Sequence, residues 1–165
     1  MLAAVMLCFA GCAEEPGLDA SKFAELRQTT RDLNTVIASK KPCDVPETLL
    51  QRLSSGIAVL QVKATSKEER DLTSAYRNLL TTYEDGLLLC RSRTLLTDFQ
   101  FVPKGRIYVT QELDPLVEKY GFTTEKHLYQ PTGMYWKSIA GNSIKVIWER
   151  AGFQIKNIEN ILTYR

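Results

Sequence analysis

A long apolar stripe between residues 66 and 97 constrains the fold of this chain more than any other feature. Its members recur every three or four positions, which places them on one side of an α-helix. Ser66 can cap this helix, and Glu69, three residues later, completes a capping box. The stripe therefore predicts the longest helix of the chain. Its members are Leu72, Tyr76, Leu79, Tyr83, Leu87, Cys90 and Thr94.

Two further helices are predicted before it. The first begins near Asp19 or Ser21, either of which can serve as a cap, and ends before Pro42. The second begins at Pro46, because proline is tolerated in the first turn of a helix. Short connections make neighbouring helices antiparallel, so residues 18–97 predict an antiparallel three-helix bundle. The two stripes are Phe23, Leu26, Thr30, Leu33 and Ile37, followed by Leu49, Leu50, Leu53, Ile57 and Leu60.

Residues 98–165 differ in character, because glycine and proline interrupt shorter elements there. We expect a short strand over residues 106–110 and a short helix over residues 112–120, ended by Gly121. Residues 139–162 fit either a helix or a hairpin, and we favour a helix because the 3–4 spacing outlasts the alternation. The predicted fold is mainly α: the bundle, followed by a mixed C-terminal region with short helices, with or without a small β element.

The N-terminus carries a sequence signal of its own. Residues 1–11 are uncharged and too few to span a bilayer, but they suit the apolar core of a signal peptide. Leu7-Cys8-Phe9-Ala10-Gly11-Cys12 resembles the lipobox of bacterial lipoproteins. The resemblance implies removal of residues 1–11, lipidation of Cys12, and a polar tether over residues 12–17. The lack of Lys or Arg before the apolar run suggests an upstream start codon, and the alternative is a short buried helix with an incidental cysteine.

Lipidation implies a location as well. Ala13, directly after the lipidated cysteine, is similar to the residues that direct lipoproteins to the outer membrane, usually on its periplasmic face. The acyl chains on Cys12 would supply the membrane affinity, since two or more chains anchor a protein stably. The net charge of +2 comes from interleaved charges of both signs, which does not indicate nucleic acid binding.

Removal of Cys8 and lipidation of Cys12 would leave one pair of cysteines. Cys43 and Cys90 lie at similar distances from the turn between the second and third predicted helices, and therefore at similar heights in an antiparallel pair. In an oxidising compartment, an even number of cysteines favours a disulfide. The alternative is two buried free thiols.

Few residues or motifs in the sequence indicate catalysis or metal binding. His127 is the only histidine, so no usual zinc set is available, and its use as a haem ligand is less favoured than a surface role. No nucleophile elbow, phosphate-binding loop or dinucleotide motif occurs. An enzyme would need Glu112, Asp114, Glu125 or His127 to converge in a cleft. We expect no cofactor.

The segment from residue 120 to residue 148 is rich in aromatic side chains, and such segments often form binding surfaces. The alternative is that these side chains complete the core. The leading hypothesis is a non-enzymatic, lipid-anchored module that binds another envelope protein. The second is a carrier or sensor of a small apolar ligand, with a cleft between the bundle and residues 98–165. The candidate surface consists of Tyr120, Phe122, Tyr129, Tyr135, Trp136 and Trp148.

Overall fold

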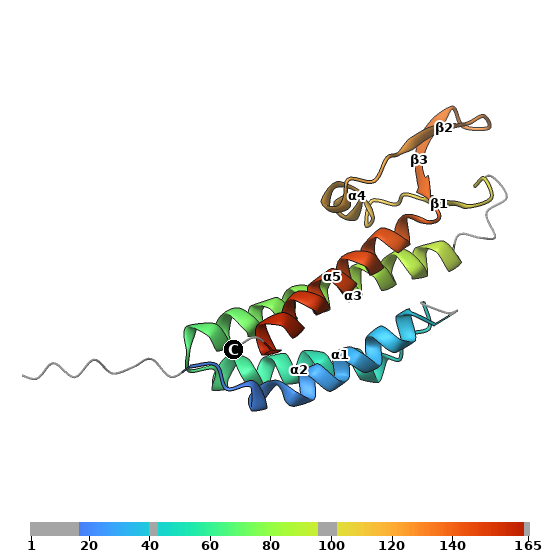
Figure 1. Cartoon of the computed structure of the whole chain (residues 1–165). Helices are drawn as coiled ribbons and strands as arrows, with labels where there is room; N and C mark the ends of the chain where they lie inside the picture. The colour runs from blue at the N-terminus through green and yellow to red at the C-terminus, as the bar shows by residue number, and fades with distance from the viewer. Residues whose placement is uncertain (1–16, 40–42, 96–101, 164–165) are drawn as a thin grey trace, which may run out of the picture.

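The computed structural model describes residues 17–39, 43–95 and 102–163, and the described part is mainly helical (Figure 1). A small antiparallel sheet accompanies the helices. The elements are the 3₁₀-helix η1 (Ala20–Phe23), α1 (Ala24–Ile37), α2 (Glu47–Lys63), α3 (Lys67–Leu95), β1 (Arg106–Tyr108), α4 (Asp114–Tyr120), β2 (Glu125–Tyr129), β3 (Met134–Ala140) and α5 (Ser143–Thr163).

The local signals that predicted the helices act as expected. Asp19 Oδ1 accepts a hydrogen bond from Ser21 N at 3.0 Å and caps η1. Ser66 Oγ accepts one from Glu69 N at 3.1 Å at the start of α3. Gly121 ends α4 in the left-handed conformation, with a φ of 64°. These side-chain and glycine caps satisfy backbone groups that helix ends leave unpaired.

Four helices surround the first core. Helices α1 and α2 pack together, α2 packs on α3, and α5 packs on α3 and on α1. Helix α5 also lines this core, since it has its own apolar face to bury. The antiparallel three-helix arrangement of residues 18–97 stays a prediction. The buried residues of this core are Phe23, Leu26, Leu33, Leu53, Ile57, Leu60, Leu72, Tyr76, Leu79, Tyr83, Ala151 and Ile158.

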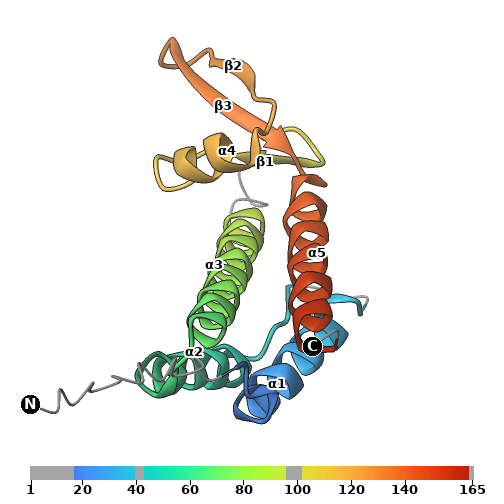
Figure 2. The same cartoon turned by 60° about the vertical axis from the view of Figure 1, so that its left-hand side comes forward.

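A second core lies where α3 and α5 meet β1, β3 and α4 (Figure 2). In this view α4 and the sheet sit above the upper parts of α3 and α5, while α1 and α2 lie at the other end. Helices α3 and α5 thus belong to both cores and connect them. The buried residues of the second core are Leu89, Cys90, Ile107, Val109, Leu113, Leu116, Ile139, Ile144 and Ile147.

The sheet has the strand order β1-β3-β2, and both pairings are antiparallel. Strand β1 pairs Ile107 with Ile139, and both side chains are buried in the second core. Strand β2 pairs His127 with Trp136 and Tyr129 with Met134. Only part of the sheet packs on the helices, so strands β2 and β3 project from the body as a hairpin (Figure 1).

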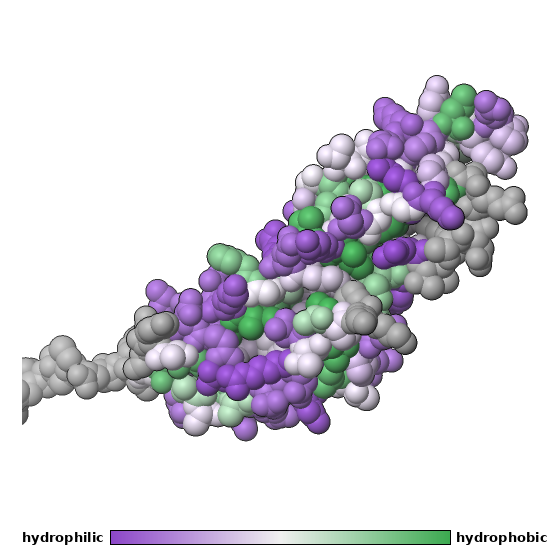
Figure 3. Space-filling view, turned by 45° about the vertical axis from the view of Figure 1, so that its right-hand side comes forward, coloured by the Kyte–Doolittle hydropathy of each residue, from purple (hydrophilic) through white to green (hydrophobic). Residues whose placement is uncertain are grey.

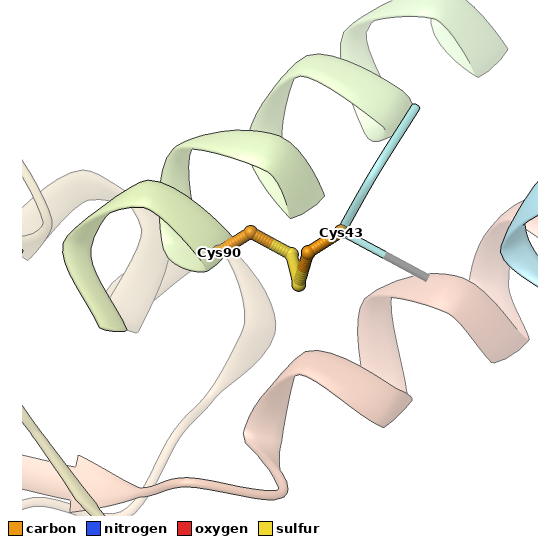
Figure 4. The surroundings of a disulfide bond; sticks show 2 residues. All are labelled: Cys43 and Cys90. Carbon is orange, nitrogen blue, oxygen red and sulfur yellow. A yellow bond between two sulfur atoms is a disulfide. The ribbon is translucent and has the colours of Figure 1, made fainter. Parts of the chain in front are cut away.

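Covalent and ionic links join distant segments of the helical part. A disulfide connects Cys43, before α2, to Cys90 on α3, with a Cα–Cα distance of 5.6 Å (Figure 4). The sequence prediction that these two cysteines meet is thus in agreement with the structure. Arg27 and Arg31 of α1 both contact the carboxylate of Glu159 on α5, and the Arg27 guanidinium holds the pKa of that carboxyl below its usual range.

The C-terminal expectations are met in part. Residues 143–163 form a helix rather than a hairpin, as favoured, but residues 134–140 before it form a strand. The strand expected over residues 106–110 is shorter, at Arg106–Tyr108. Residues 1–16, which include the lipobox and Cys12, lie outside the described residues, so their assignment stays a prediction.

Candidate functional site

The outer part of the β2–β3 hairpin exposes four large apolar side chains next to one another in the strand pairing. Leu128 lies opposite Tyr135, and Tyr129 lies opposite Met134. The exposed fractions are 50% for Leu128, 39% for Tyr129, 67% for Met134 and 73% for Tyr135. We call these four residues the hairpin patch, in which Leu128 and Tyr135 lie on one face of the hairpin and Tyr129 and Met134 on the other. Figure 3 shows apolar atoms among hydrophilic ones at the end of the molecule where the hairpin lies.

The turn of the hairpin explains why these residues are presented together. Tyr129 O accepts hydrogen bonds from Gly133 N at 2.9 Å and from Thr132 N at 3.2 Å. Gly133 has a φ of 70°, a conformation that glycine adopts without a steric penalty. The turn fixes the register of the strands, and the register places the patch at the outermost pairs.

A polar and aromatic cluster lies at the inner end of the hairpin. Arg106 donates from Nε to Ser138 Oγ at 3.0 Å and pairs with Glu125 at 2.8 Å. His127 Nε2 lies 2.8 Å from the same Ser138 oxygen, and the imidazole ring stacks on Trp136 at 4.2 Å. These contacts link all three strands, because Arg106 belongs to β1, Ser138 to β3, and His127 to β2. The cluster therefore stiffens the base on which the patch stands.

Ser138 beside His127 has the composition of a nucleophile and base, but the geometry does not allow that use. The Ser138 side chain is fully buried, and Arg106 already donates to its oxygen. A nucleophile must reach a substrate, and this hydroxyl has no exposed surface. We assign Ser138 a structural role.

Two of the other catalytic candidates, Glu125 and His127, belong to the cluster described above, and the remaining two, Glu112 and Asp114, lie just before and at the start of α4. Glu125 pairs with Arg106, and Asp114 pairs with Lys137 at 3.4 Å. Glu112 is exposed and His127 is half-buried in the cluster described above. Within residues 17–39, 43–95 and 102–163, no group of three or more His, Cys, Asp or Glu side chains gathers as a metal site would require.

Two lysines accompany the patch. Lys126 and Lys137 lie directly opposite each other in the register, on the same side of the hairpin as Leu128 and Tyr135. Like charges in that position repel each other. Lys137 has a partner in Asp114, but in the described part of the chain Lys126 has no ion pair. This side of the hairpin is therefore both apolar and basic.

The six aromatic residues predicted as a surface divide into three places. Tyr129, Tyr135 and Trp136 belong to the hairpin, as described above. Tyr120 and Phe122 stack on each other at the end of α4 and pack against the second core. Tyr120 Oη donates to Asp85 on α3 at 2.7 Å, and burial together with this contact raises the pKa of its hydroxyl.

Trp148 lies elsewhere, between the two cores on α5. Its indole packs over Gly86 of α3 so closely that a Cβ at that position would overlap the ring. Trp148 therefore fills the space between α3 and α5 and does not belong to the hairpin. Its six-membered ring occupies the space that the glycine leaves on α3.

Leu128 and Met134 belong to the patch but were not among the predicted residues. A signal for them exists in the sequence, because Pro131-Thr132-Gly133 separates two runs rich in aromatic and branched residues, which is typical of a hairpin. Once a hairpin is recognised, its register groups Leu128 with Tyr135 and Met134 with Tyr129.

A groove of about 790 Å³ lies between α2 and α3, beside the disulfide. Val45, Leu50, Leu87 and the Cys43–Cys90 bridge supply its apolar lining. All of its lining residues fall between 43 and 91, so it is not the expected cleft between the bundle and residues 98–165. Its polar lining consists of Asp44, Glu47, Gln51, Ser54, Glu84 and Arg91.

Comparison with known proteins finds no match among family descriptions, curated proteins or solved structures. Of the helices described, none has both the length and the apolar character needed to cross a membrane.

Proposed function

We propose that this protein is a lipid-anchored envelope module without catalytic activity, which uses its β-hairpin to bind another envelope protein. The N-terminal lipobox resemblance supports the anchor at Cys12 and a position on the periplasmic face of the outer membrane. The disulfide supports an oxidising compartment, because such bonds persist there and are rare in the cytosol.

The observation that carries the binding proposal is the position of the hairpin patch. Asp19, close to the start of the described chain, donates its backbone N–H to Glu69 at the beginning of α3. The second core, which supports the hairpin, begins at Leu89 on the same helix. The twenty residues between Glu69 and Leu89 span about 30 Å. A lipid on Cys12 would hold the near end at the membrane and leave the hairpin facing away from it.

A binding role also explains why apolar side chains are exposed at this end. Clustered exposed apolar residues on a soluble surface commonly mark an interaction site. Tyrosine and methionine are enriched in protein interfaces. The patch contains both, on a hairpin held by a turn and by a polar cluster at its base, so little order has to be created on binding.

The anchor is tested by growing cells with labelled palmitate and separating their membranes. We expect label on the protein and recovery in the outer-membrane fraction. The Cys12→Ser variant should lose both the label and the membrane association. Labelling of Cys12→Ser at the level of the unchanged protein would contradict the anchor.

Partner binding is tested by placing a photocrosslinking residue at Tyr135 in living cells. We expect a discrete crosslinked product that disappears when Leu128→Ser and Met134→Ser are introduced together. Val62 on α2 is 88% exposed and gives a matched control position on the helical part. The same product from both positions, or none from Tyr135, would contradict the proposal.

A second candidate is a carrier of a small ligand in the groove between α2 and α3. Its volume falls within the range of about 300–1,000 Å³ that small-molecule pockets occupy. Six of its eleven lining residues are charged or polar, so we rank this candidate below partner binding. Titration with a fluorescent fatty acid tests this candidate. Saturable binding that is lost in Leu87→Trp would support it, and the absence of saturable binding would exclude a lipid carrier.

A further inference from the structure

Along β2, the main-chain N–H and C=O groups that point away from β3 form no hydrogen bond within the sheet. Val109 N donates to Lys137 O at 2.9 Å, so the main-chain groups of Lys137 point toward β1. Directions alternate along an antiparallel strand, and those of Trp136 therefore point toward β2. His127 lies opposite Trp136, and its own groups point back toward β3.

The same alternation turns the N–H and C=O groups of Lys126 and Leu128 outward. Strand β2 is an edge of the sheet, and its pairing is with β3. In the described part of the chain, no backbone hydrogen bond from outside the sheet reaches these two residues. The exposed edge thus offers two donors and two acceptors in line, which is the arrangement that an added strand uses.

The side chains of these two edge residues are also exposed. Lys126 supplies a positive charge without an ion pair among the described residues, and Lys137 lies beside it. Leu128 supplies apolar surface and has Tyr135 beside it. An incoming strand would meet, on this side, one position that favours an acid and one that favours an apolar residue, two residues apart.

We propose that the hairpin binds its partner by strand addition: an extended peptide segment with an apolar-x-acidic pattern pairs antiparallel with the free edge of β2. The apolar residue lies opposite Leu128 and the acidic residue opposite Lys126. This inference rests on the proposed function, because it names the kind of segment that the hairpin patch accepts. Main-chain bonds supply affinity, and the alternate side chains supply specificity.

Charge argues against a second copy of this chain as the occupant. Two β2 edges paired about His127 would place Lys126 and Lys137 from both copies on one side of a continuous sheet. Like charges on neighbouring strands are destabilising, and a lysine at an edge is a common device against self-pairing. An acidic segment from a different protein neutralises the same pair.

A synthetic heptapeptide, acetyl-Thr-Thr-Ile-Thr-Glu-Thr-Thr-amide, is the probe. We expect millimolar peptide to shift the amide resonances of Lys126 and Leu128 in the isotope-labelled, oxidised protein. Methylation of the isoleucine and glutamate amides should abolish the shifts, because those two groups face β2. A peptide with lysine in place of glutamate should bind at least about tenfold more weakly.

Two variants at one position separate main-chain pairing from side-chain contact. Leu128→Pro removes an outward N–H without touching the β2–β3 bonds, since proline is tolerated at an edge. We expect it to weaken peptide binding at least about tenfold. Leu128→Ala keeps the N–H, and we expect a loss of only about threefold. Spectra of both variants away from the hairpin should match those of the unchanged protein, which shows that they fold.

Several results would overturn strand addition. These are equal binding of the methylated peptide, equal binding by Leu128→Pro, or a concentration-dependent dimer with shifts at β2. If Leu128→Pro abolishes peptide binding but keeps the cellular crosslink from Tyr135, the hairpin binds a partner in another way, and only this inference fails. Loss of a Tyr135-specific crosslink under all conditions means that the proposed function fails.

Discussion

The two ends of the molecule are stabilised in different ways. At the end where α1, α2, α3 and α5 meet, large side chains such as Tyr76 and Leu79 are fully buried. At the other end, β2 has no fully buried side chain, and its outer residues are exposed on both sides of the hairpin. The helical end depends on packing, whereas the hairpin depends on backbone pairing, one turn and a polar cluster at its base.

The difference indicates which positions are constrained by packing and which can be occupied by residues that serve a binding function. A buried position is selected for its fit, because close-packed cores tolerate little change in volume. An exposed pair such as Leu128 and Tyr135 contributes little to the core, so its apolar character calls for another explanation. Binding supplies one, and stability measurements at both ends test it.

The largest expected effect comes from removing the disulfide, which joins the segment before α2 to the second core. The Cys43→Ala, Cys90→Ala double variant should lose about 4 kcal/mol of unfolding free energy, because a bridge between residues 47 apart restricts the unfolded chain. Urea denaturation measures it, and the unchanged protein with reductant should give the same value. A loss below about 1 kcal/mol would mean that the bridge does not form or does not constrain unfolding.

A core truncation comes next. Leu79→Ala should cost about 3 kcal/mol, since it leaves a cavity in a fully buried part of α3. Leu128→Ala makes the same chemical change on the hairpin and should cost less than about 0.5 kcal/mol. Equal losses in urea denaturation would show that the hairpin is packed as tightly as the helical end, and the contrast between the two ends would be wrong.

Acid sensitivity provides a third contrast. The ammonium of Lys22, 2.7 Å from Glu69, together with backbone donors, lowers the pKa of that carboxyl from about 4.5 to about 2. Because the pKa is lower in the folded state, the contribution of Glu69 to stability is complete above about pH 4.5 and disappears as the pH falls toward 2. Glu69→Gln should cost about 2 kcal/mol at neutral pH, because it breaks charge-assisted hydrogen bonds.

The pH dependence gives the control for that variant. Denaturation of Glu69→Gln should show a weaker decline in stability between about pH 4.5 and pH 2 than the unchanged protein. Glu118→Gln makes the same change at an exposed residue of α4 and should leave the decline unchanged. If the two variants behave alike, the carboxylate of Glu69 does not link η1 to α3 in solution.

Sequence periodicity was sufficient for the helices because each one buries a single face. Most members of the α1 and α2 stripes, and those of α3 from Leu72 to Tyr83, line the first core, whereas Cys90 belongs to the second. Ser66 with Glu69 marks where α3 begins. Periodicity alone did not show which residues of α5 line the first core, because that depends on contacts between residues far apart in the chain. Trp148 shows the same limit: its aromatic ring favoured a surface role, but the inner face of α5 buries it against Gly86.

The hairpin was missed for a physical reason. A strand is recognised when one side is buried, since apolar and polar residues then alternate. Lys126, His127, Leu128 and Tyr129 show no such alternation, because β2 has no buried side. The property that concealed the strand is the one that leaves its edge and side chains available for a partner.

The smallest expected effect on stability tests that link directly. The Leu128→Ser, Tyr135→Ser double variant should change the unfolding free energy by less than about 0.5 kcal/mol, because both side chains are largely exposed. Partner capture, measured by a photocrosslinker at Met134, should nevertheless disappear. Val59→Ser with Val62→Ser makes a comparable exposed change on α2 and should keep capture. A stability loss of about 2 kcal/mol in the hairpin variant would identify the two side chains as core residues, whereas unchanged capture would separate their exposure from any binding role.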